Sequence, residues 1–275
     1  MRRQMSSDAL IQEQNVSDAF STQSVLFDET DERNLTIKWM REEVREHVMK
    51  LWRSGDSILE LNAGTGLDAI FFAEKGFNVH ATDNAQGMID VLNEKMPRQT
   101  LRGIITTQRC SFNELENINR SEFDHIFSNF GGLNCTNRLD DVINSFDRLL
   151  KPGGTATLVI MPKICPWELI LALKGNFKIA FRRLKKGGVR SHLEGKYFNT
   201  YYYSPAQVRK MFGEKYSVVS IKGLGIFVPP PYLDTFPVKH PRIYKALQGI
   251  DKGISTIPPF RSFADHFIIS VRKNG

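Results

Sequence analysis

The segment that says most about this chain is SILELNAGTG, residues 57–66. Its first half, residues 57–61, is an apolar run of strand length, and Gly64 and Gly66 follow directly. Residues 67–75 then have the apolar spacing of a helix. Glycines at such a turn let a ligand approach the backbone, and the helix N-terminus offers free amide groups to an anion. The segment therefore predicts a ligand-binding loop at the end of a strand.

An acidic residue follows the next predicted strand. Residues 78–82 read as that strand, and Asp83 comes directly after it, 17 residues beyond Gly66. A carboxylate at this position can accept hydrogen bonds from both hydroxyls of an adenosine ribose. The alternative, a tight turn followed by a solvated aspartate, is disfavoured because the motif spacing agrees with the strand positions. The loop and Asp83 together predict a site for an adenosine-containing ligand.

Strand-like and helix-like segments alternate along most of the chain, which predicts an α/β fold with a Rossmann-like, doubly wound parallel sheet and helices on both of its faces. Residues 1–30 show little periodicity and are expected to be partly mobile. The apolar periods predict helices at residues 35–52, 67–75, 86–95 and 140–150, a short helix from Ser204-Pro205, and strands at residues 57–61, 78–82, 104–107, 124–128, 155–161, 217–221 and 266–272.

Two long segments interrupt this alternation in the C-terminal half. Residues 162–203 are basic and rich in aromatic side chains, and residues 225–264 are rich in proline. Proline in this number suits a structured insertion better than a sheet element. The chain is therefore interpreted as one domain with two insertions.

The composition excludes several classes of protein. Apolar residues make up 41% and charged residues 24% of the 275 residues, so the chain can bury a large core and is not intrinsically disordered. Three scattered cysteines are too few for a disulfide scaffold. Because there is no uncharged apolar stretch of about 18 residues and no signal-peptide pattern, the expectation is a soluble cytoplasmic protein.

The net charge of +7 is concentrated in one segment. Residues 169–193 hold seven basic residues and no acidic one, so the rest of the chain is balanced. A nucleic-acid binder would spread its basic residues over several segments, so no nucleic-acid partner is expected. Apolar and basic side chains interleave through residues 167–186. Two interpretations stay open: a cover helix with a solvated basic face, or a helix lying on a membrane surface or over a hydrophobic substrate.

The glycine loop alone does not select the adenosine ligand, because residues 64–69, GTGLDA, also fit the dinucleotide fingerprint. Three features argue against a nicotinamide cofactor. Glu60 precedes Gly64 by four residues, the loop lies about 60 residues into the chain, and Asp68 would face the pyrophosphate at the helix start. A nicotinamide-dependent oxidoreductase is therefore the weaker interpretation.

Taken in order, several motifs resemble the class I S-adenosylmethionine-dependent methyltransferases, particularly the small-molecule branch with a methyltransferase domain of type 11/25. The resemblance implies a mostly parallel seven-stranded sheet with an antiparallel C-terminal strand. It also implies an N-terminal lid, residues 1–34, and one methyltransferase domain, residues 35–275, whose insertions at 162–203 and 225–264 form a cap over the acceptor site. The matching motifs are residues 58–66, 79–84, 123–129, 149–154 and 203–205.

The resemblance implies that S-adenosylmethionine binds along the first half of the chain and leaves as S-adenosylhomocysteine. It places the methionine part beside Glu60 and the glycine loop, the ribose on Asp83 and the sulfonium beside Asn129. Phe27-Asp28 resembles an aromatic-acid pair of the lid. The implied cofactor-binding residues are Phe27, Arg41, Glu60, Asn62, Ala63, Gly64, Gly66, Asp83, Asn84, Met88, Ser111, Phe112, Asn129 and Phe130.

Two positions depart from the family pattern. Asn62 stands where the family has its first glycine, and Ser111 stands where an acid often accepts a hydrogen bond from the adenine amine. Asparagine tolerates left-handed backbone geometry better than most residues, so the turn is expected to survive. Adenine selection is expected to rest more on backbone contacts and stacking than on a carboxylate.

Methyl transfer needs a general base only if the acceptor must lose a proton. His192 lies in the first insertion and is the candidate catalytic or acceptor-orienting residue, with a solvated loop histidine as the alternative. Tyr201, Tyr202 and Tyr203 form either a wall of the acceptor pocket or an ordinary packed strand, and alternation would send Tyr202 to the face opposite the other two. No metal site is predicted.

The sequence therefore predicts an enzyme that transfers a methyl group to a small, hydrophobic or aromatic acceptor. The alternative class is a non-catalytic protein that keeps the fold and the cofactor for binding or assembly. Nucleic-acid methylation is disfavoured because residues 129–132, NFGG, lack the proline-aromatic step typical of base-amine methylation in related families.

Overall fold

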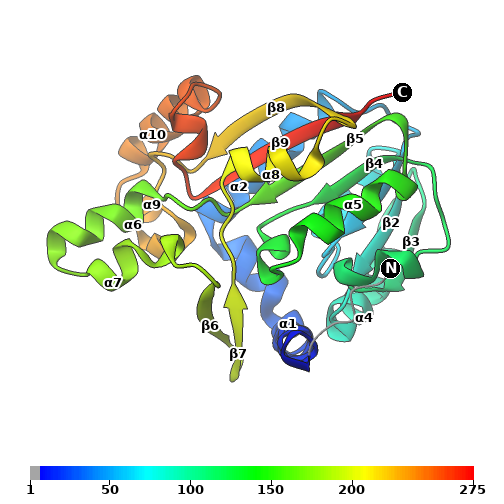
Figure 1. Cartoon of the computed structure of the whole chain (residues 1–275), viewed down its shortest axis with the longest axis horizontal. Helices are drawn as coiled ribbons and strands as arrows, with labels where there is room; N and C mark the ends of the chain where they lie inside the picture. The colour runs from blue at the N-terminus through cyan, green and yellow to red at the C-terminus, as the bar shows by residue number, and fades with distance from the viewer. Residues whose placement is uncertain (1–6) are drawn as a thin grey trace.

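A seven-stranded sheet runs through the middle of the computed structural model, which describes residues 7–275 (Figure 1). The strand order is β3-β2-β1-β4-β5-β9-β8, and β9 runs in the direction opposite to the other six strands. The predicted fold class is thus confirmed, with its mostly parallel sheet and antiparallel C-terminal strand. The strands are β1 Ser57–Leu61, β2 Asn78–Asp83, β3 Ile105–Arg109, β4 Phe123–Ser128, β5 Leu150–Ile160, β8 Tyr216–Leu224 and β9 His266–Lys273.

Helices cover both faces of the sheet, and successive strand residues alternate between two cores. Ile58 and Phe127 pack with α2, α3 and α4, whereas Leu59 and Ile126 pack with α5 and α8. All four side chains are fully buried, which explains why the central strands read as continuous apolar runs. These helices are α2 Leu35–Met49, α3 Leu67–Glu74, α4 Gln86–Lys95, α5 Leu139–Leu149 and α8 Pro205–Phe212.

Polar side chains fix where two of these helices begin. The Asn34 side chain accepts hydrogen bonds from the backbone N–H groups of Thr36 and Ile37 at the start of α2. Ser204 and Gln207 form a capping box at the start of α8, where a proline occupies the first turn. The predicted helix start at Ser204 is therefore explained by its own capping chemistry.

The N-terminal segment forms a long helix, α1, over Ser7–Arg33. The segment expected to be partly mobile, residues 1–30, is thus helical from residue 7 onward, and residues 1–6 lie outside the described part. The buried residues of α1 are small or polar: Ser17, Ala19, Ser24 and Asp31. A helix that docks through such residues shows no apolar period, so the sequence pattern could not reveal it.

The first insertion forms a helical projection followed by a hairpin. Its helical part consists of four short turns and breaks at Gly175, whose φ of 77° is left-handed. It is therefore not the single helix considered for residues 167–186. Its elements are α6 Pro166–Ile170, η4 Leu171–Lys174, α7 Phe177–Ala180, η5 Arg182–Leu184, β6 Val189–Leu193 and β7 Lys196–Thr200.

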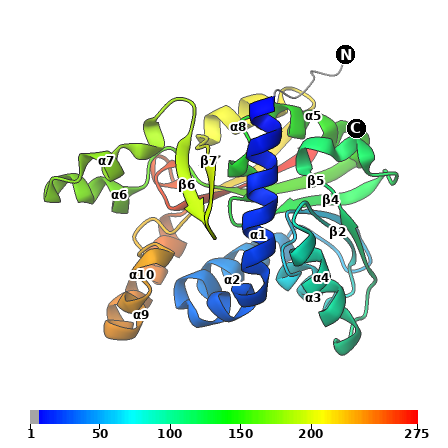
Figure 2. The ribbon, with the colours of Figure 1, turned by 90° about the horizontal axis from the view of Figure 1, so that it is seen from below.

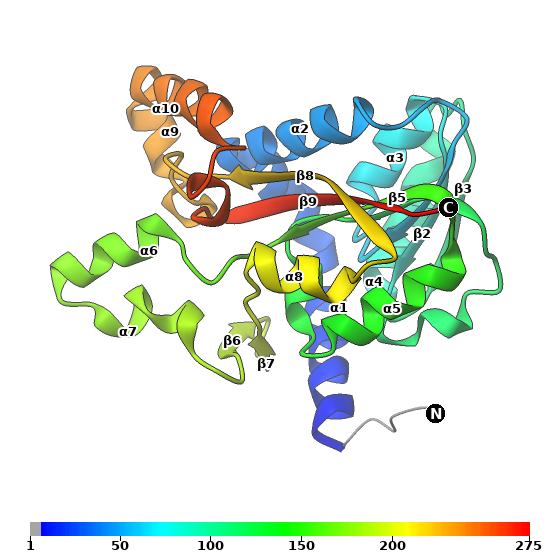
Figure 3. The ribbon, with the colours of Figure 1, turned by 45° about the horizontal axis from the view of Figure 1, so that its top comes forward.

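The second insertion lies on the same side of the molecule as the helices of the first (Figures 1 and 3). The Asp251 carboxylate accepts hydrogen bonds from three consecutive backbone N–H groups, those of residues 226–228, and so closes the insertion on itself. Within residues 7–275, no helix is long and apolar enough to cross a membrane. The elements of this insertion are η6 Pro231–Leu233, α9 Thr235–Lys239, α10 Pro241–Ile254 and η7 Phe260–Ser262.

The carboxyl ends of the parallel strands all reach one edge of the sheet, which is where ligands bind in open α/β folds. Helix α1 passes over this edge beside the β6-β7 hairpin (Figure 2). Short 3-10 turns complete the connections near the edge: η1 Met96–Arg98, η2 Phe112–Asn117 and η3 Gly132–Cys135.

Candidate functional site

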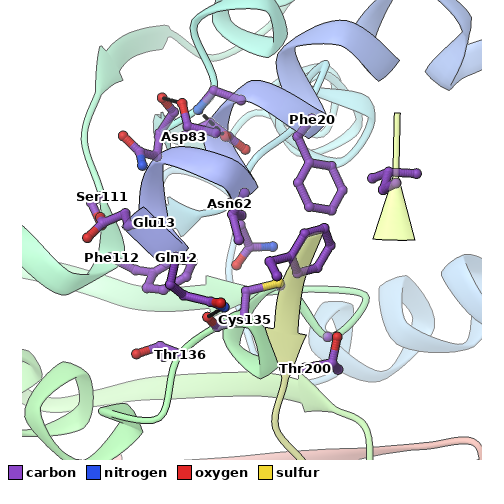
Figure 4. A pocket seen from close by; sticks show the side chains of 18 of the residues that line it. Gln12, Glu13, Phe20, Asn62, Asp83, Ser111, Phe112, Cys135, Thr136 and Thr200 are labelled. Atoms are coloured by element: carbon purple, nitrogen blue, oxygen red, sulfur yellow. Dashed lines mark hydrogen bonds between the residues drawn. The ribbon is translucent and has the colours of Figure 1, made fainter. Parts of the chain in front are cut away.

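A cavity of about 1050 Å³ lies at this edge. Its floor comes from the loops that follow β1, β2 and β4, and its cover comes from α1 and the β6-β7 hairpin. Figure 4 shows Asn62, Ser111 and Cys135 around the cavity, together with Gln12 and Phe20 of α1. Pockets for single small ligands span about 300 to 1,000 Å³. The cavity is therefore large enough for a cofactor and a second molecule.

The loop between β1 and α3 turns through three residues in the left-handed region: Asn62 with φ 48°, Gly64 with φ 58° and Gly66 with φ 81°. A Cβ at Gly66 would lie 2.1 Å from a methyl carbon of Leu92, so this position requires glycine. Asn62 adopts a left-handed backbone conformation, which asparagine tolerates better than most residues. The departure at residue 62 therefore leaves the turn intact.

The Asn62 side chain also joins two strand ends. Its Nδ2 donates to the backbone oxygen of Asn129 at 3.0 Å, and its Oδ1 accepts from Ser128 Oγ at 2.6 Å. A Cβ at Gly132 would lie 2.3 Å from Asn62 Cγ. An asparagine here thus supplies hydrogen bonds that a glycine lacks, and it holds the loops after β1 and β4 together.

Asp83 lies at the end of β2 and faces the cavity. Its two carboxylate oxygens accept hydrogen bonds from the backbone N–H groups of Gly64 and Ala85, both at 2.9 Å. Burial raises the pKa of Asp83, and these hydrogen bonds oppose the rise. Each carboxylate oxygen has a further lone pair. Asp83 can therefore hold the glycine loop and still accept hydroxyl groups of a ligand.

Glu60 is 2% exposed, lines the cavity, and has one oxygen, Oε2, with no hydrogen-bond partner among the described residues. Burial, assisted by the neighbouring Asp68 carboxylate, raises the pKa of Glu60 well above its ordinary value. A buried carboxyl oxygen without a partner costs about 1–3 kcal/mol or more. The free oxygen of Glu60 is suited to accept a hydrogen bond from a cationic donor of a ligand, such as the ammonium of an amino acid group.

Asp68, at the start of α3, is enclosed by cations. Its oxygens bind Arg41 Nη1 at 2.6 Å, Arg45 Nε at 2.7 Å and Asn129 Nδ2 at 2.8 Å. These groups lower the pKa of Asp68. Arg41 and Arg45 thus compensate the negative charge of Asp68, which was expected to repel a pyrophosphate. The argument against a dinucleotide that rested on this charge is therefore weaker.

Arg41 is buried and bound on two sides, because Asp31 of α1 accepts from its Nη2 at 2.8 Å and from its Nε at 3.2 Å. The guanidinium lies 4.5 Å from the centre of the Phe130 ring. Three of its five N–H donors are engaged with Asp31 and Asp68. Arg41 lines the cavity, and two donors are left for the carboxylate of a ligand.

The C-terminal half of α1 closes over the glycine loop. Asp28 accepts from Thr65 Oγ1 at 2.5 Å and pairs with Lys95 at 2.6 Å. A Cβ on Gly64 would lie 3.9 Å from the Phe27 ring, so this ring covers the loop. The two lid residues that the resemblance singled out therefore lie over the glycine loop, whose Ala63 also lines the cavity.

The far end of the cavity joins α4 and η2. Four of the implied cofactor-binding residues line it: Asn84, Met88, Ser111 and Phe112. Glu13 of α1 lies beside Ser111 and Phe112 (Figure 4), and the nearby side chains of Ser111 and Asn113 act to lower its pKa. Burial raises the pKa of Glu13. The structure thus brings a carboxylate next to the position where the sequence lacks one.

The middle of the cavity carries few ionisable groups. Asn129 and Phe130 line it, and Phe130 has a left-handed φ of 48°. The Asn129 carboxamide accepts from the Phe130 N–H at 2.8 Å while donating to Asp68, so both ends of the side chain are fixed. Burial raises the pKa of the Cys135 thiol to about 12, so this cysteine stays protonated and is a poor nucleophile.

Helix α1 and the β6-β7 hairpin are fastened to each other across the cavity. Gln12 donates to the backbone oxygens of Asn199 at 2.8 Å and Cys135 at 3.2 Å, and it accepts from the Asn199 N–H at 2.7 Å. Asn15 donates to the Tyr197 oxygen at 3.0 Å. Three of these bonds join the two parts of the cover, and the bond to Cys135 joins α1 to the floor.

The candidates on the acceptor side divide between the cavity and the core. His192 and Tyr201 line the cavity, and the exposed His192 ring lies 4.5 Å from that of Tyr197. Tyr203 packs in the core and donates its hydroxyl to the Thr136 oxygen, and Arg183 stacks on Tyr202 at 5.2 Å. All three tyrosines follow the end of β7, so strand alternation does not apply to them. The structure keeps Tyr202 and Tyr203 out of the cavity lining that it describes.

The second insertion does not cover this cavity. None of the lining residues within 7–275 belongs to residues 225–264, because α10 packs instead on α2, where Tyr244 contacts Thr36 at 3.3 Å. The expectation that both insertions form the cap therefore fails for the second. The cap residues that the sequence did not indicate lie on α1 and β7, where no motif marks them: Gln12, Glu13, Phe20, Phe198 and Thr200.

Comparison with known proteins agrees with this geometry. Residues 58–154 match the family model described as a methyltransferase domain. A demethylmenaquinone methyltransferase of Leptospira interrogans is 28% identical over 125 residues, which cover 44% of this chain and 50% of that protein. The chain thus spans about half the length of the curated relatives that it matches.

Solved structures share the fold across most of the chain. A putative S-adenosylmethionine-dependent methyltransferase from Listeria monocytogenes superposes with a TM-score of 0.58 at 15% identity and covers 84% of this chain and 96% of its own. A geranyl diphosphate C-methyltransferase from Streptomyces coelicolor A3(2) superposes with a TM-score of 0.53 at 14% identity, covering 85% and 79%. The chain thus shares the fold of S-adenosylmethionine-dependent methyltransferases of known structure, and its residues 58–154 match a methyltransferase domain.

Proposed function

We propose that this protein transfers the methyl group of S-adenosylmethionine to a small, apolar acceptor. The observation that carries the proposal is the unpartnered Oε2 of buried Glu60, in the same cavity as Asp83 and the left-handed glycine loop. The Glu60 carboxylate suits the ammonium group of the methionine part of the cofactor. The Asp83 carboxylate suits the hydroxyl groups of its ribose. The matching family model supports the same function.

Each part of the cofactor has a group of this chain to hold it. In the proposal, Glu60 binds the ammonium, the free donors of Arg41 bind the carboxylate, and Asp83 accepts the ribose hydroxyls. Met88 and Phe112 pack on the adenine. Glu13, which lies beside Ser111, accepts from the adenine amine in place of the missing acid. The remaining contacts come from Phe27, Asn62, Ala63, Gly64, Gly66, Asn84, Ser111, Asn129 and Phe130.

The chain's own contribution to the transfer is alignment and exclusion of water. The cofactor, when bound, supplies an activated methyl group on a sulfonium. The fixed Asn129 side chain and the Phe130 ring hold the reacting region, and the Gln12 contacts keep the cover closed over it. Holding the two reactants in alignment lowers the entropy cost that a bimolecular encounter adds to the reaction barrier. His192, at the cavity wall, is the candidate for orienting an acceptor or removing its proton.

The proposed acceptor is apolar because aliphatic and aromatic side chains line the cavity beside polar ones such as Asn15 and Arg190. Ile11, Val16, Phe20, Phe198 and Tyr201 line it between α1 and the hairpin. Aromatic and aliphatic walls of this kind favour flat or hydrophobic molecules. The name of the Leptospira relative specifies demethylmenaquinone, so a demethylated naphthoquinone is a suitable first probe for this chain.

The cofactor step is tested by titration calorimetry with S-adenosylhomocysteine, with NAD as the control ligand. Binding of S-adenosylhomocysteine and none of NAD is expected. Asp83→Ala should weaken binding by about 1–3 kcal/mol, because a buried acceptor of two hydroxyl groups is lost. Equal affinity in the variant, or binding of NAD alone, would contradict the assignment.

The transfer step is tested with methyl-labelled cofactor and the demethylated naphthoquinone, followed by a fractionated metabolite extract. Label in an organic-soluble product supports the proposal. If S-adenosylhomocysteine binds and no fraction accepts label, the non-catalytic alternative holds instead. The matched variants are His192→Ala, which should lower turnover, and Tyr202→Phe, outside the cavity lining, which should leave it unchanged.

A further inference from the structure

The helical part of the first insertion exposes large apolar side chains. Leu173 is 88% exposed and Phe177 is 61% exposed, and these two residues flank the break at Gly175. The projection stands away from the sheet on the left of Figure 1. Apolar side chains at a projecting tip gain nothing in water, so they indicate a surface that a partner covers. The other exposed members are Leu169, Ile170, Ile179, Phe181 and Leu184.

The charges beside these side chains have one sign. Lys174, Lys178, Lys185 and Lys186 are exposed, and residues 169–193 contain no acid. The nearest acid, Glu168, is 1% exposed and is neutralised by Arg182 and Arg183. The projection therefore presents apolar and cationic groups together without any exposed carboxylate.

The second insertion extends the same surface. Trp167 of α6 donates to the Phe227 oxygen at 3.2 Å, which joins the two insertions. Val238 is 70% exposed and Ile243 is 54% exposed on α9 and α10. Residues 162–203 and 225–264 together hold fourteen basic and four acidic residues, whereas the rest of the chain holds 23 basic and 26 acidic. The positive charge of the protein is thus gathered on the side that carries the exposed apolar groups.

We propose that the insertion surface, the exposed side chains of residues 169–186 with those of α9 and α10, docks on an anionic lipid bilayer. Apolar side chains enter the acyl boundary while lysines meet the headgroups, which is the arrangement of interfacial helices. An acidic protein partner would match the charge, but it would not surround the projecting side chains of Leu173 and Phe177. A soft, apolar medium such as the acyl region of a bilayer would surround them. The proposal is independent of the methyl transfer, because no residue of 169–186 lines the described cavity.

The test is co-sedimentation of the full chain with two kinds of vesicle: phosphatidylcholine alone, and equal parts of phosphatidylcholine and phosphatidylglycerol. Binding to the acidic vesicles should exceed binding to the neutral ones and should fall with added salt. Each basic residue near an anionic surface contributes about fivefold to affinity. Lys174→Gln with Lys178→Gln should therefore weaken binding at least tenfold.

A second variant separates insertion from charge attraction. Leu173→Ser with Phe177→Ser should weaken binding to acidic vesicles by more than about tenfold, since each fully buried apolar side chain contributes at least about that factor. The matched control is Ile104→Ser with Arg102→Gln, because both residues are exposed beside the opposite edge strand, β3. Circular dichroism and the melting temperature check that each variant keeps its fold.

Equal binding to the two kinds of vesicle, or full binding by the Leu173 and Phe177 variant, would overturn the proposal. So would a dimer in sedimentation velocity without lipid that these two substitutions abolish, because the surface would then be an interface between copies of this chain. Binding that depends on acidic lipid and on both pairs of residues supports it.

Discussion

Glu60 carries a buried carboxyl group that destabilises the protein without a ligand. Its Oε2 atom is buried and has no partner within the part of the chain that is described, and its pKa is raised by burial and by the carboxylates around it. An unpaired buried carboxyl is among the costliest groups that a protein can hold. A cationic ligand group would relieve that cost, so stability and binding oppose each other at this position.

Glu60→Gln should raise the melting temperature of the free protein and abolish measurable binding of S-adenosylhomocysteine. The pH dependence follows from the raised pKa: the folded protein binds this proton more tightly than the unfolded chain, so the contribution of Glu60 to stability is lost as pH rises through the folded pKa. Glutamine cannot ionise and removes this loss. Calorimetric melting at several pH values measures it, and a lower melting temperature for the variant at high pH would contradict the interpretation.

At the scale of elements, the important contact is between α1 and the β6-β7 hairpin. Gln12 makes three hydrogen bonds to the backbone on the far side of the cavity, two with Asn199 and one with Cys135. The nearby Gln14 has an exposed side chain that donates a hydrogen bond to Asp18 of the same helix. The two glutamines therefore differ in whether they cross the cavity.

Gln12→Ala should loosen the cover without unfolding the sheet. Loss of these bonds, each worth about 0.5–1.5 kcal/mol, should raise hydrogen exchange in β7 and speed dissociation of S-adenosylhomocysteine. Gln14→Ala is the matched control and should change neither. Hydrogen-exchange mass spectrometry and stopped-flow dissociation measure the two effects; equal exchange in β7 of both variants would show that the cover is held by other contacts.

The same contact marks the limit of prediction from the sequence. The sequence predicted the glycine loop, Asp83 and the strand positions because patterns within short segments specify them. One such pattern is an apolar run that ends at a turn, where the position beside Leu92 requires Gly66. Helix α1 was not, because it docks through Ser17 and Ala19 rather than through an apolar stripe. The places of Tyr202 and Tyr203 depend on where the chain leaves β7, which no local pattern records.

At the scale of the whole molecule, the first insertion is tied to the sheet through one buried arginine. Arg183 binds Glu168 Oε1 and Asp265 Oδ1, each at 2.8 Å, and the Asp265 backbone oxygen at 2.9 Å. Arg183 is 4% exposed, and Asp265 directly precedes β9. Arg182 binds the same glutamate, but its side chain is 38% exposed. The two arginines thus offer a buried and a partly solvated contact to the same carboxylate.

Arg183→Ala should lower the free energy of unfolding by about 3–5 kcal/mol, because buried Asp265 loses its guanidinium partner and buried Glu168 keeps only the partly exposed Arg182. Arg182→Ala should cost about 1 kcal/mol or less, since water replaces much of a partly exposed pair. Arg182 and Arg183 lower the pKa of Glu168, and His266 together with Arg183 lowers the pKa of Asp265. Their contribution is therefore present above the unfolded pKa values and is lost as pH falls through the folded ones, so the wild type should lose more stability than Arg183→Ala on acidification. Urea unfolding at neutral and acidic pH measures both effects, and equal losses for Arg182→Ala and Arg183→Ala would show that the buried arginine does not hold the insertion to the sheet.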